Sequence, residues 1–307
     1  PRISHYIDTS ACWRKEAILS TGGWQSGMNA EDWALGRDMW LAGWELMPSG
    51  IQFNWQATPG NRSEVKCGGQ VVWEAKDFAI VILLRGNYDL LEKVKASLES
   101  LEVPRHCGIT LMCEGGEEFR MAAQEMIEGD ERFERKTVVC NRPPPLPFGA
   151  DDFLKIHARV GDLYSRAFRM TPEEAILTWE DDVQPEPGAL RALSDQLGSF
   201  GDVAAVGAPY ITRGSEDLAA SWGKEWWDSP IKVSELKDGP MDIGMIAGGW
   251  TLWAKAALED CPMLGPMGVL GKEGFMGWDG FICNRINRNG WKIQLCPDSK
   301  VYHEPHK

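Results

Sequence analysis

Residues 175–183 read AILTWEDDV, an apolar run that ends in three consecutive carboxylates, Glu180, Asp181 and Asp182. An apolar run of this kind is typical of a buried strand in a parallel sheet. Because like charges packed at the end of such a strand repel one another, an uncompensated acidic triplet there is costly. A divalent cation removes that cost, and hard oxygen ligands suit Mg2+ or Mn2+. The alternative is a solvated turn, since residues 183–188 (VQPEPG) are typical of a turn that leads into a helix.

Strand-like and helix-like segments alternate from Phe78 onward, which predicts an α/β fold with a mainly parallel sheet flanked by helices. The run FAIVILL at 78–84 predicts a strand, and apolar residues then recur at helical spacing over 90–101. We also predict strands at 109–113 and 137–140, a helix over 150–170, and a strand that ends at Glu180.

The carboxyl ends of these strands are where a ligand is expected, as in other open α/β sheets. Arg85, Glu114 and the acidic triplet 180–182 each follow one of the predicted strands, so we expect them to converge at one edge of the sheet. This convergence favours the metal site over the solvated turn.

Composition excludes several classes of function. The chain has 307 residues, 43% of them hydrophobic and 25% charged, and is long enough for two domains or for one large α/β domain with an attached segment. A formal net charge of −13 repels phosphate backbones, which argues against a nucleic-acid partner. No apolar run approaches the roughly 20 residues that cross a bilayer, so we predict no transmembrane segment.

Cysteine usage bears on the compartment. The eight cysteines include no CxxC pair and no metal-finger spacing, which indicates free thiols in a reducing environment. We therefore expect a cytoplasmic protein, with peripheral attachment to a membrane left open.

An internal repeat links the first 75 residues to the end of the chain. Asp32 is followed eleven residues later by Gly-Trp at 43–44, and Asp279 is followed eleven residues later by Gly-Trp at 290–291. The blocks WRKEA and WAKAA, upstream of the two aspartates, also match. The alternative is chance, since Gly-Trp after a helix is a common turn into a strand. We interpret residues 1–75 as the C-terminal half of a truncated preceding domain and 76–307 as a complete domain, within a longer polypeptide.

The larger unit, residues 77–307, resembles the family 2 glycosyltransferases and related inverting enzymes of the GT-A fold, which has a Rossmann-like mixed sheet. The resemblance rests on the turn at 85–87, on Glu114, on the EDD triplet in place of the family's DxD motif, and on Trp278-Asp279 followed by Arg285 and Gly290. It implies an enzyme that moves a sugar from a nucleotide-diphosphate donor to a hydroxyl group on a glycan or related acceptor. UDP-sugars are the commonest donors in that family.

The metal ligands follow from the same resemblance. It implies that Asp182 binds Mn2+ or Mg2+, while Glu180 or Asp181 faces the ribose or a metal-bound water. A C-terminal histidine often completes the metal site in such enzymes, and His303 falls where it is expected. His306 is the competing candidate.

Nucleotide contacts are implied for residues at two other strand ends. Arg85 matches the turn that contacts the nucleotide, and Glu114 matches the acidic residue near the base. Arg159, on the predicted helix over 150–170, is a candidate for the phosphates. The alternative for Arg159 is that it belongs to the solvated face of an amphipathic helix.

The resemblance implies that Asp279 is the general base, which takes the proton of the acceptor hydroxyl during an inverting attack. Where the family has a glutamate before this aspartate, the chain has Trp278. The Trp-Asp pair also resembles the inverting N-acetylglucosaminyltransferases of the Golgi, whose metal motif similarly reads EDD. From the residues alone, helix-start chemistry favours a helix N-cap for Asp279, a role that is compatible with catalysis. If capping is its only role, retention of configuration stays open.

Sugar contacts are expected from aromatic residues and glycines. Trp226 and Trp227 lie in a polar segment where their rings either stack on sugars or pack in the core. Trp278 neighbours the expected base. Gly249 precedes a strand-like run and either lets the backbone approach the donor sugar or forms a tight turn.

The sequence thus predicts an inverting, metal-dependent glycosyltransferase, with a role in polysaccharide synthesis. The alternative is a non-catalytic carbohydrate-binding or scaffold protein on a decayed fold of the same type. A nucleotidyltransferase that makes the activated sugar is disfavoured, because residues 85–87 are too poor in glycine for a phosphate-binding loop.

Overall fold

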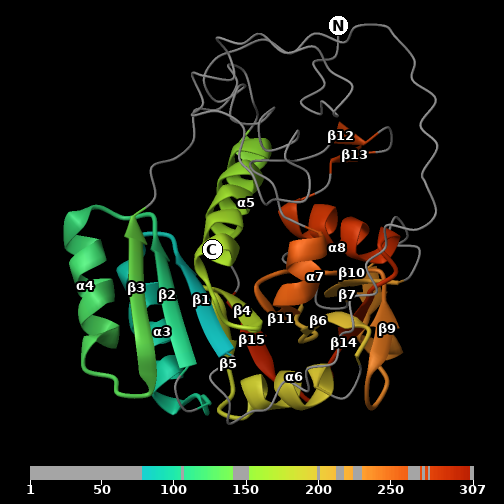
Figure 1. The fold of residues 1–307 in the computed structure, drawn as a ribbon, viewed down its shortest axis with the longest axis horizontal. Helices are drawn as coiled ribbons and strands as arrows, with labels where there is room; N and C mark the ends of the chain where they lie inside the picture. The colour runs from blue at the N-terminus through green and yellow to red at the C-terminus, as the bar shows by residue number, and fades with distance from the viewer. Residues whose placement is uncertain are drawn as a thin grey trace, which may run out of the picture.

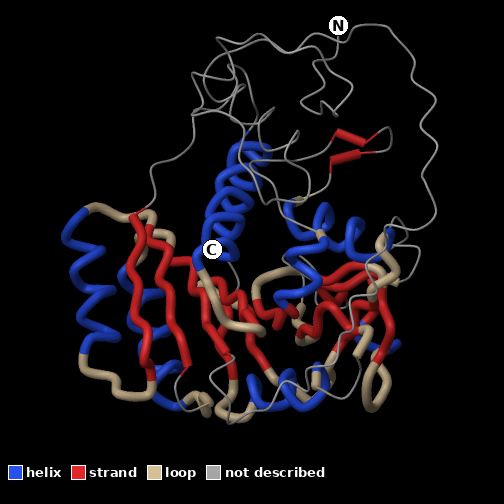
Figure 2. The backbone as a smooth tube through the Cα atoms, in the orientation of Figure 1, coloured by secondary structure: helices blue, strands red, loops and turns tan. Residues whose placement is uncertain are grey.

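The computed structural model describes residues 78–104, 107–140, 152–198, 201–211, 218–223, 230–261, 270–271, 274–275 and 277–304. The segment interpreted as a truncated domain, residues 1–75, lies outside this part of the chain, as do Trp226, Trp227 and His306. The described part is built around one large sheet with helices on both faces (Figures 1 and 2).

The central sheet has eight strands in the order β3-β2-β1-β4-β11-β6-β14-β9. Its first four strands are mutually parallel: β3 (Phe133–Cys140), β2 (Cys107–Cys113), β1 (Phe78–Leu84) and β4 (Ala175–Glu180). The next strand, β11 (Trp250–Ala254), is antiparallel to both of its neighbours. It is followed by β6 (Val203–Gly207) and β14 (Lys292–Leu295), which are parallel to each other, and by the antiparallel edge strand β9 (Met241–Ile243). This mixed, mainly parallel sheet confirms the predicted fold class.

Two hydrophobic clusters hold the helices against the two faces of the sheet. One face carries α3 (Tyr88–Ser100), α4 (Glu117–Glu128) and α6 (Ala189–Leu197), and the other carries α5 (Asp152–Met170), α7 (Lys255–Asp260) and α8 (Trp278–Arg288). Strand β1 contributes alternate residues to the two clusters, with Ile80 and Ile82 on one side and Val81 and Leu83 on the other. Burial on both faces explains why its sequence is continuously apolar.

The remaining described elements are short. β5 (Val183–Pro185) pairs with β15 (Val301–His303), a second small sheet contains β7 (Leu218–Trp222), β8 (Pro230–Lys232) and β10 (Met245–Ile246), and β12 (Leu270–Gly271) pairs with β13 (Gly274–Phe275). A 3-10 helix covers Val233–Glu235. Among the described helices, none combines the length and the apolar composition that a membrane span requires.

The order of the strands reverses between β1 and β4. Strands β1, β2 and β3 step along the sheet in one direction, and β4, which follows α5, then pairs with β1 on its other side. A reversal of this kind opens a crevice at the carboxyl ends of the two central strands, which is the usual ligand site of an open α/β sheet. In this chain the residues that leave those strand ends are Arg85 and the acidic triplet.

Candidate active site

The acidic triplet lies at the end of β4, and its second and third carboxylates are buried. Glu180 is the last residue of the strand, and its N–H donates to the carbonyl of Gly249 at 2.9 Å. Asp181 and Asp182 are 1% and 0% exposed. The solvated-turn alternative is therefore wrong for these two aspartates, because both side chains are removed from water.

Arg85, at the end of β1, compensates part of this buried charge. Its backbone N–H donates to Asp181 Oδ2 at 2.8 Å, and its Nε donates to Asp181 Oδ1 at 2.7 Å. Its Nη2 lies 2.8 Å from Asp182 Oδ2. Burial raises the pKa of Asp181 above its usual value even though the neighbouring Arg85 charge acts to lower it.

These contacts turn the Asp181 side chain toward Arg85, whereas the expectation was that Glu180 or Asp181 faces the ribose or a metal-bound water. Both of its carboxylate oxygens are bonded to Arg85, and the side chain is buried. Of the two candidates for the ribose or for a metal-bound water, only Glu180 is partly exposed. The sequence does not reveal this difference, because the three carboxylates are adjacent and chemically alike.

His303 reaches the site through the pairing of β15 with β5, in which it lies opposite Val183. Its Nε2 is 3.6 Å from Asp182 Oδ2, and its Nδ1 is 3.0 Å from the carbonyl oxygen of Ile211. A carbonyl only accepts hydrogen bonds, so Nδ1 carries a proton in this contact, and in the neutral ring Nε2 is then the nitrogen with the lone pair that a metal binds. A metal-binding histidine commonly fixes its second ring nitrogen in this way.

The donor set therefore fits a divalent cation. Asp182 Oδ2 and His303 Nε2 lie 3.6 Å apart, which is close enough for one divalent cation to bind both atoms. Within the described ranges, no group of three or more His, Cys, Asp or Glu side chains has an arrangement that would hold a metal ion. Two protein ligands are enough where phosphate oxygens and water complete the coordination shell.

Glu114 and Arg159 meet beside the same strand ends. The N–H of Glu114 donates to the carbonyl of Leu84 at 2.8 Å, and its Oε1 lies 2.6 Å from Arg159 Nε. The turns that follow β1 and β2 also lie against each other, since a Cβ on Gly86, which has a φ of 82°, would lie only 3.3 Å from the Cα of Gly115. The expected convergence of Arg85, Glu114 and the triplet is thus observed, and Arg159 joins it through Glu114.

The glycines before β11 make room for aromatic rings. A Cβ on Gly249 would lie 2.7 Å from Tyr210 Oη, and one on Gly248 would lie 2.1 Å from Trp278 Cη2. The N–H of Gly249 donates to Tyr210 Oη at 3.1 Å. The group that lies close to the backbone of Gly249 is therefore a tyrosine of this chain, and the sugar contact expected of Gly249 stays a prediction.

Trp278 is a core residue in this structure. It is 3% exposed, and its ring lies 4.5 Å from that of Tyr164 at 36°. A ring buried this deeply has little surface left for a sugar, so we assign Trp278 to packing, in place of the sugar contact that the sequence suggested.

Asp279 lies in the first turn of α8 and is partly exposed. The residue before the helix is Gly277, so Asp279 is inside the helix and is not its N-cap; its Oδ1 accepts the N–H of Gly280 at 2.9 Å. It lies in the same surroundings as the acidic triplet, since the charges of Asp279, Glu180 and Asp182 all act on the hydroxyl of Tyr210.

Two tyrosines at this site were not predicted. Burial raises the pKa of Tyr210 well above its usual value, and the nearby charges of Glu180, Asp279 and Asp182 raise it further. The Tyr164 hydroxyl is also buried, near Glu180, and has no hydrogen-bond partner among the described residues. Single tyrosines in apolar surroundings carry no sequence signal that would distinguish them from core residues.

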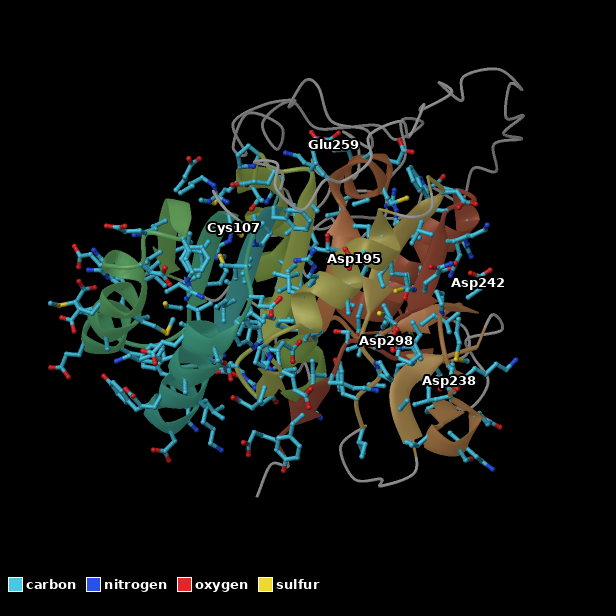
Figure 3. All side chains as sticks on the ribbon, turned by 90° about the horizontal axis from the view of Figure 1, so that it is seen from below. Cys107, Asp195, Asp238, Asp242, Glu259 and Asp298 are labelled. Atoms are coloured by element: carbon cyan, nitrogen blue, oxygen red, sulfur yellow. The ribbon has the colours of Figure 1, made fainter. Side chains whose placement is uncertain are left out.

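A separate open hollow of about 520 Å3 lies beside α6 and contains none of the predicted site residues. Asp195 and Asp298 line it, and they lie in the same half of the molecule as Asp238 and Asp242 (Figure 3). Arg191 also lines this hollow, so its lining carries both signs of charge. The crevice between β1 and β4 is the candidate site because the predicted site residues meet there.

No protein-family model matches the chain, and no curated protein matches its sequence. Solved structures do match. One is the mannosyltransferase PcManGT from Pyrobaculum calidifontis in complex with GDP-Man and Mn2+, which is 12% identical with a TM-score of 0.51 over 75% of this chain and 57% of that one. Another is TarS from S. aureus in complex with UDP-GlcNAc, which is 10% identical with a TM-score of 0.52 over 75% of this chain and 59% of that one.

These similarities concern the fold. At 10% and 12% identity they support a GT-A-like, Rossmann-like architecture. The chain covers less than three fifths of the length of either solved structure.

Proposed function

We propose that this protein is an inverting, metal-dependent glycosyltransferase that uses a nucleotide-diphosphate sugar, with a UDP-sugar as the favoured donor and a hydroxyl group of a glycan as the acceptor. The observation that carries the proposal is the approach of Asp182 Oδ2 and His303 Nε2, 3.6 Å apart at the point where the strand order reverses. Two structural neighbours are described with nucleotide sugars, and one of them also with Mn2+, which supports the same chemistry.

Asp182 and His303 would hold Mn2+ or Mg2+, which when bound neutralises the charge that develops on the leaving nucleoside diphosphate. Glu180 is partly exposed beside them, and we assign it to the ribose or to a metal-bound water. Arg85 and the Glu114–Arg159 pair flank the crevice, where we expect them to orient the phosphates and the base of the donor.

Asp279 would act as the general base. It would accept the proton of the acceptor hydroxyl as that oxygen attacks the anomeric carbon from the face opposite the leaving group, which inverts the configuration. Its place in the first turn of α8 supports this role, because the helix N-terminus favours a negatively charged carboxylate. Since Gly277 occupies the position before the helix, capping does not account for Asp279.

We assign this activity to residues 76–307 and retain residues 1–75 as the proposed rear half of a truncated preceding domain. The six cysteines of the described part, Cys107, Cys113, Cys140, Cys261, Cys283 and Cys296, are free thiols, which supports a reducing compartment such as the cytoplasm.

Calorimetric titration of UDP and of GDP, each with Mn2+ and with a chelator, tests the proposal. We expect one nucleotide to bind the wild-type protein only when Mn2+ is present, and Asp182→Ala to abolish that binding. Asp238→Ala is the matched control, because this aspartate is exposed and lies before β9, outside the site. If neither nucleotide binds under any condition, the scaffold hypothesis replaces the enzyme.

A further inference from the structure

Two cysteines lie side by side at the ends of neighbouring strands. Cys113 is the last residue of β2 and Cys140 is the last residue of β3, and the two are direct partners in the register of these parallel strands. Neighbouring strands lie about 4.7–4.9 Å apart, so the Cα atoms of the pair fall inside the range of about 4.4–6.8 Å that a disulfide bond spans.

Both cysteine side chains lie on the face of the sheet that α4 covers (Figure 1). Cys113 belongs to the buried cluster that contains Phe119 of α4. Val138, two residues before Cys140, packs against the same cluster. Since side chains alternate along a strand, Cys140 shares the face of Val138. The two Cβ atoms therefore point to the same side of the sheet, as a disulfide requires.

The two thiols differ in their access to solvent. Cys113 is 0% exposed, whereas Cys140 is the one exposed cysteine among those that the structure describes. Burial raises the pKa of the Cys113 thiol to about 12; the neighbouring Cys140 adds to this effect, and the charge of Arg120 on α4 opposes it. A small oxidant in solution therefore reacts first with Cys140, because Cys113 is both shielded and protonated.

We propose that Cys113 and Cys140 are an oxidation site at which a peroxide produces a reversible disulfide bond. The Cys140 thiolate attacks one oxygen of hydrogen peroxide, the O–O bond breaks, and the products are a sulfenic acid on Cys140 and a hydroxide ion. The Cys113 sulfur then attacks the Cys140 sulfur. The S–S bond forms, the S–O bond breaks, and the leaving hydroxide takes the proton of the Cys113 thiol and departs as water. Two thiols are thus oxidised while peroxide is reduced to water.

The bond joins two strand ends at the rim of the crevice. Glu114 directly follows Cys113, and its N–H and its carboxylate contact Leu84 and Arg159 respectively. The inference does not rest on the proposed function, because it requires only the two thiols and the oxidant. It is also compatible with a reducing compartment, where a disulfide forms transiently and cellular thiols reduce it by exchange.

Peptide mapping of the full chain tests the inference. The protein is treated with hydrogen peroxide, the remaining thiols are alkylated, and the tryptic peptides are analysed by mass spectrometry. Cleavage after Arg120 and Lys136 places Cys113 and Cys140 on different peptides. We expect a cross-linked pair that is lighter than its two peptides by two hydrogen atoms, that contains most of the oxidised Cys140, and that dithiothreitol separates.

Cys107 provides the matched control, because it lies in the same strand and on the same tryptic peptide as Cys113 and is also buried. We expect Cys107→Ala to retain the cross-link. Cys113→Ala is expected to abolish it and to let Cys140 proceed to a sulfinic acid, since no neighbouring thiol then captures the sulfenic acid.

Several results would overturn the inference while leaving the proposed function intact. They are an unchanged Cys140 thiol, a sulfinic acid on Cys140 of the wild type without a cross-link, and a link from Cys140 to any cysteine other than Cys113, including one of a second copy of the chain. Should Cys113→Ala not fold, fragmentation of the linked wild-type peptide shows whether Cys107 or Cys113 carries the bond, and a bond at Cys107 counts against the inference.

Discussion

At the scale of single residues, the site depends on how the His303 ring is oriented toward Asp182. His303 Nε2 points at Asp182 Oδ2 because Nδ1 is held by the carbonyl of Ile211. We predict that His303→Gln weakens Mn2+-dependent UDP binding at least about tenfold, since even the partners behind a metal ligand commonly matter by that factor. Calorimetry measures the change. Tyr302→Phe, on the neighbouring exposed side chain, is the control. An unchanged affinity in His303→Gln would transfer the ligand role to His306.

Gly249 is a second residue with a definite steric role. An added Cβ would lie 2.7 Å from Tyr210 Oη and 3.3 Å from Val183 Cγ2. We predict that Gly249→Ala lowers the free energy of unfolding by about 1–3 kcal/mol, the usual cost of overpacking, as measured by urea unfolding.

Gly129→Ala is the matched control for this substitution. A Cβ on Gly129 meets nothing within 4 Å, and its φ is −85°. Alanine there is expected to be neutral or to stabilise the protein by up to about 1 kcal/mol through the unfolded state. Equal effects of the two substitutions would refute the steric argument.

The residue scale is also where prediction from sequence reached its limit. The sequence identifies Asp181, Asp182 and Asp279 as candidates because carboxylates at strand and helix ends are recognisable. It does not reveal that Asp181 turns inward to Arg85, or that Trp278 packs on Tyr164. Such contacts depend on side-chain directions that adjacent, chemically similar residues do not encode.

At the scale of elements, the sequence was a better guide. Strands β1, β2 and β4 were predicted because strands buried on both faces are continuously apolar. Strand β3 begins at Phe133, four residues before the predicted start. The prediction started too late because the first residues of the strand are FERK, three of which are charged. Phe133 is buried, but Glu134, Arg135 and Lys136 lie at the edge of the sheet and are partly or fully exposed. A search for apolar runs misses them because they are charged.

Helix α3 begins directly after the Arg85 turn, and its start is fixed by Asn87. The side chain of Asn87 accepts the N–H of Asp89 at 2.9 Å and that of Leu90 at 3.3 Å. We predict that Asn87→Ala lowers the free energy of unfolding by about 1 kcal/mol, the typical value of an N-cap. Glu92→Ala, on the exposed face of α3, serves as the control, with a change within about 0.5 kcal/mol by chemical denaturation. A loss no larger than that of the control would mean that the cap contributes little.

The pairing of β15 with β5 places the second metal candidate. Val301 lies opposite Pro185 and His303 opposite Val183, and the N–H of Glu304 donates to the carbonyl of Asp182 at 2.8 Å. A slip of one residue in this register would turn His303 away from the site. The pairing joins segments more than a hundred residues apart, so the sequence indicated His303 only through resemblance and not through its contacts.

At the scale of the whole molecule, the buried members of both hydrophobic clusters, as far as the structure describes the chain, lie between Phe78 and Cys296. A unit with its own core folds independently as a rule. We therefore predict that a fragment of residues 76–307 unfolds cooperatively and binds UDP and Mn2+ within about twofold of the full chain. Circular dichroism and calorimetry test the two parts. A fragment that does not fold would show that residues 1–75 belong to the same unit.

The central claim is that one divalent cation sits between Asp182 and His303 when a nucleoside diphosphate occupies the crevice between β1 and β4. Its most direct test is anomalous X-ray scattering from a crystal of the protein grown with UDP and Mn2+, at the manganese absorption edge. We predict a peak within coordination distance, about 2.0–2.6 Å, of both Asp182 Oδ2 and His303 Nε2, with the diphosphate on its open side. A nucleotide bound with no manganese peak between these two side chains would contradict it.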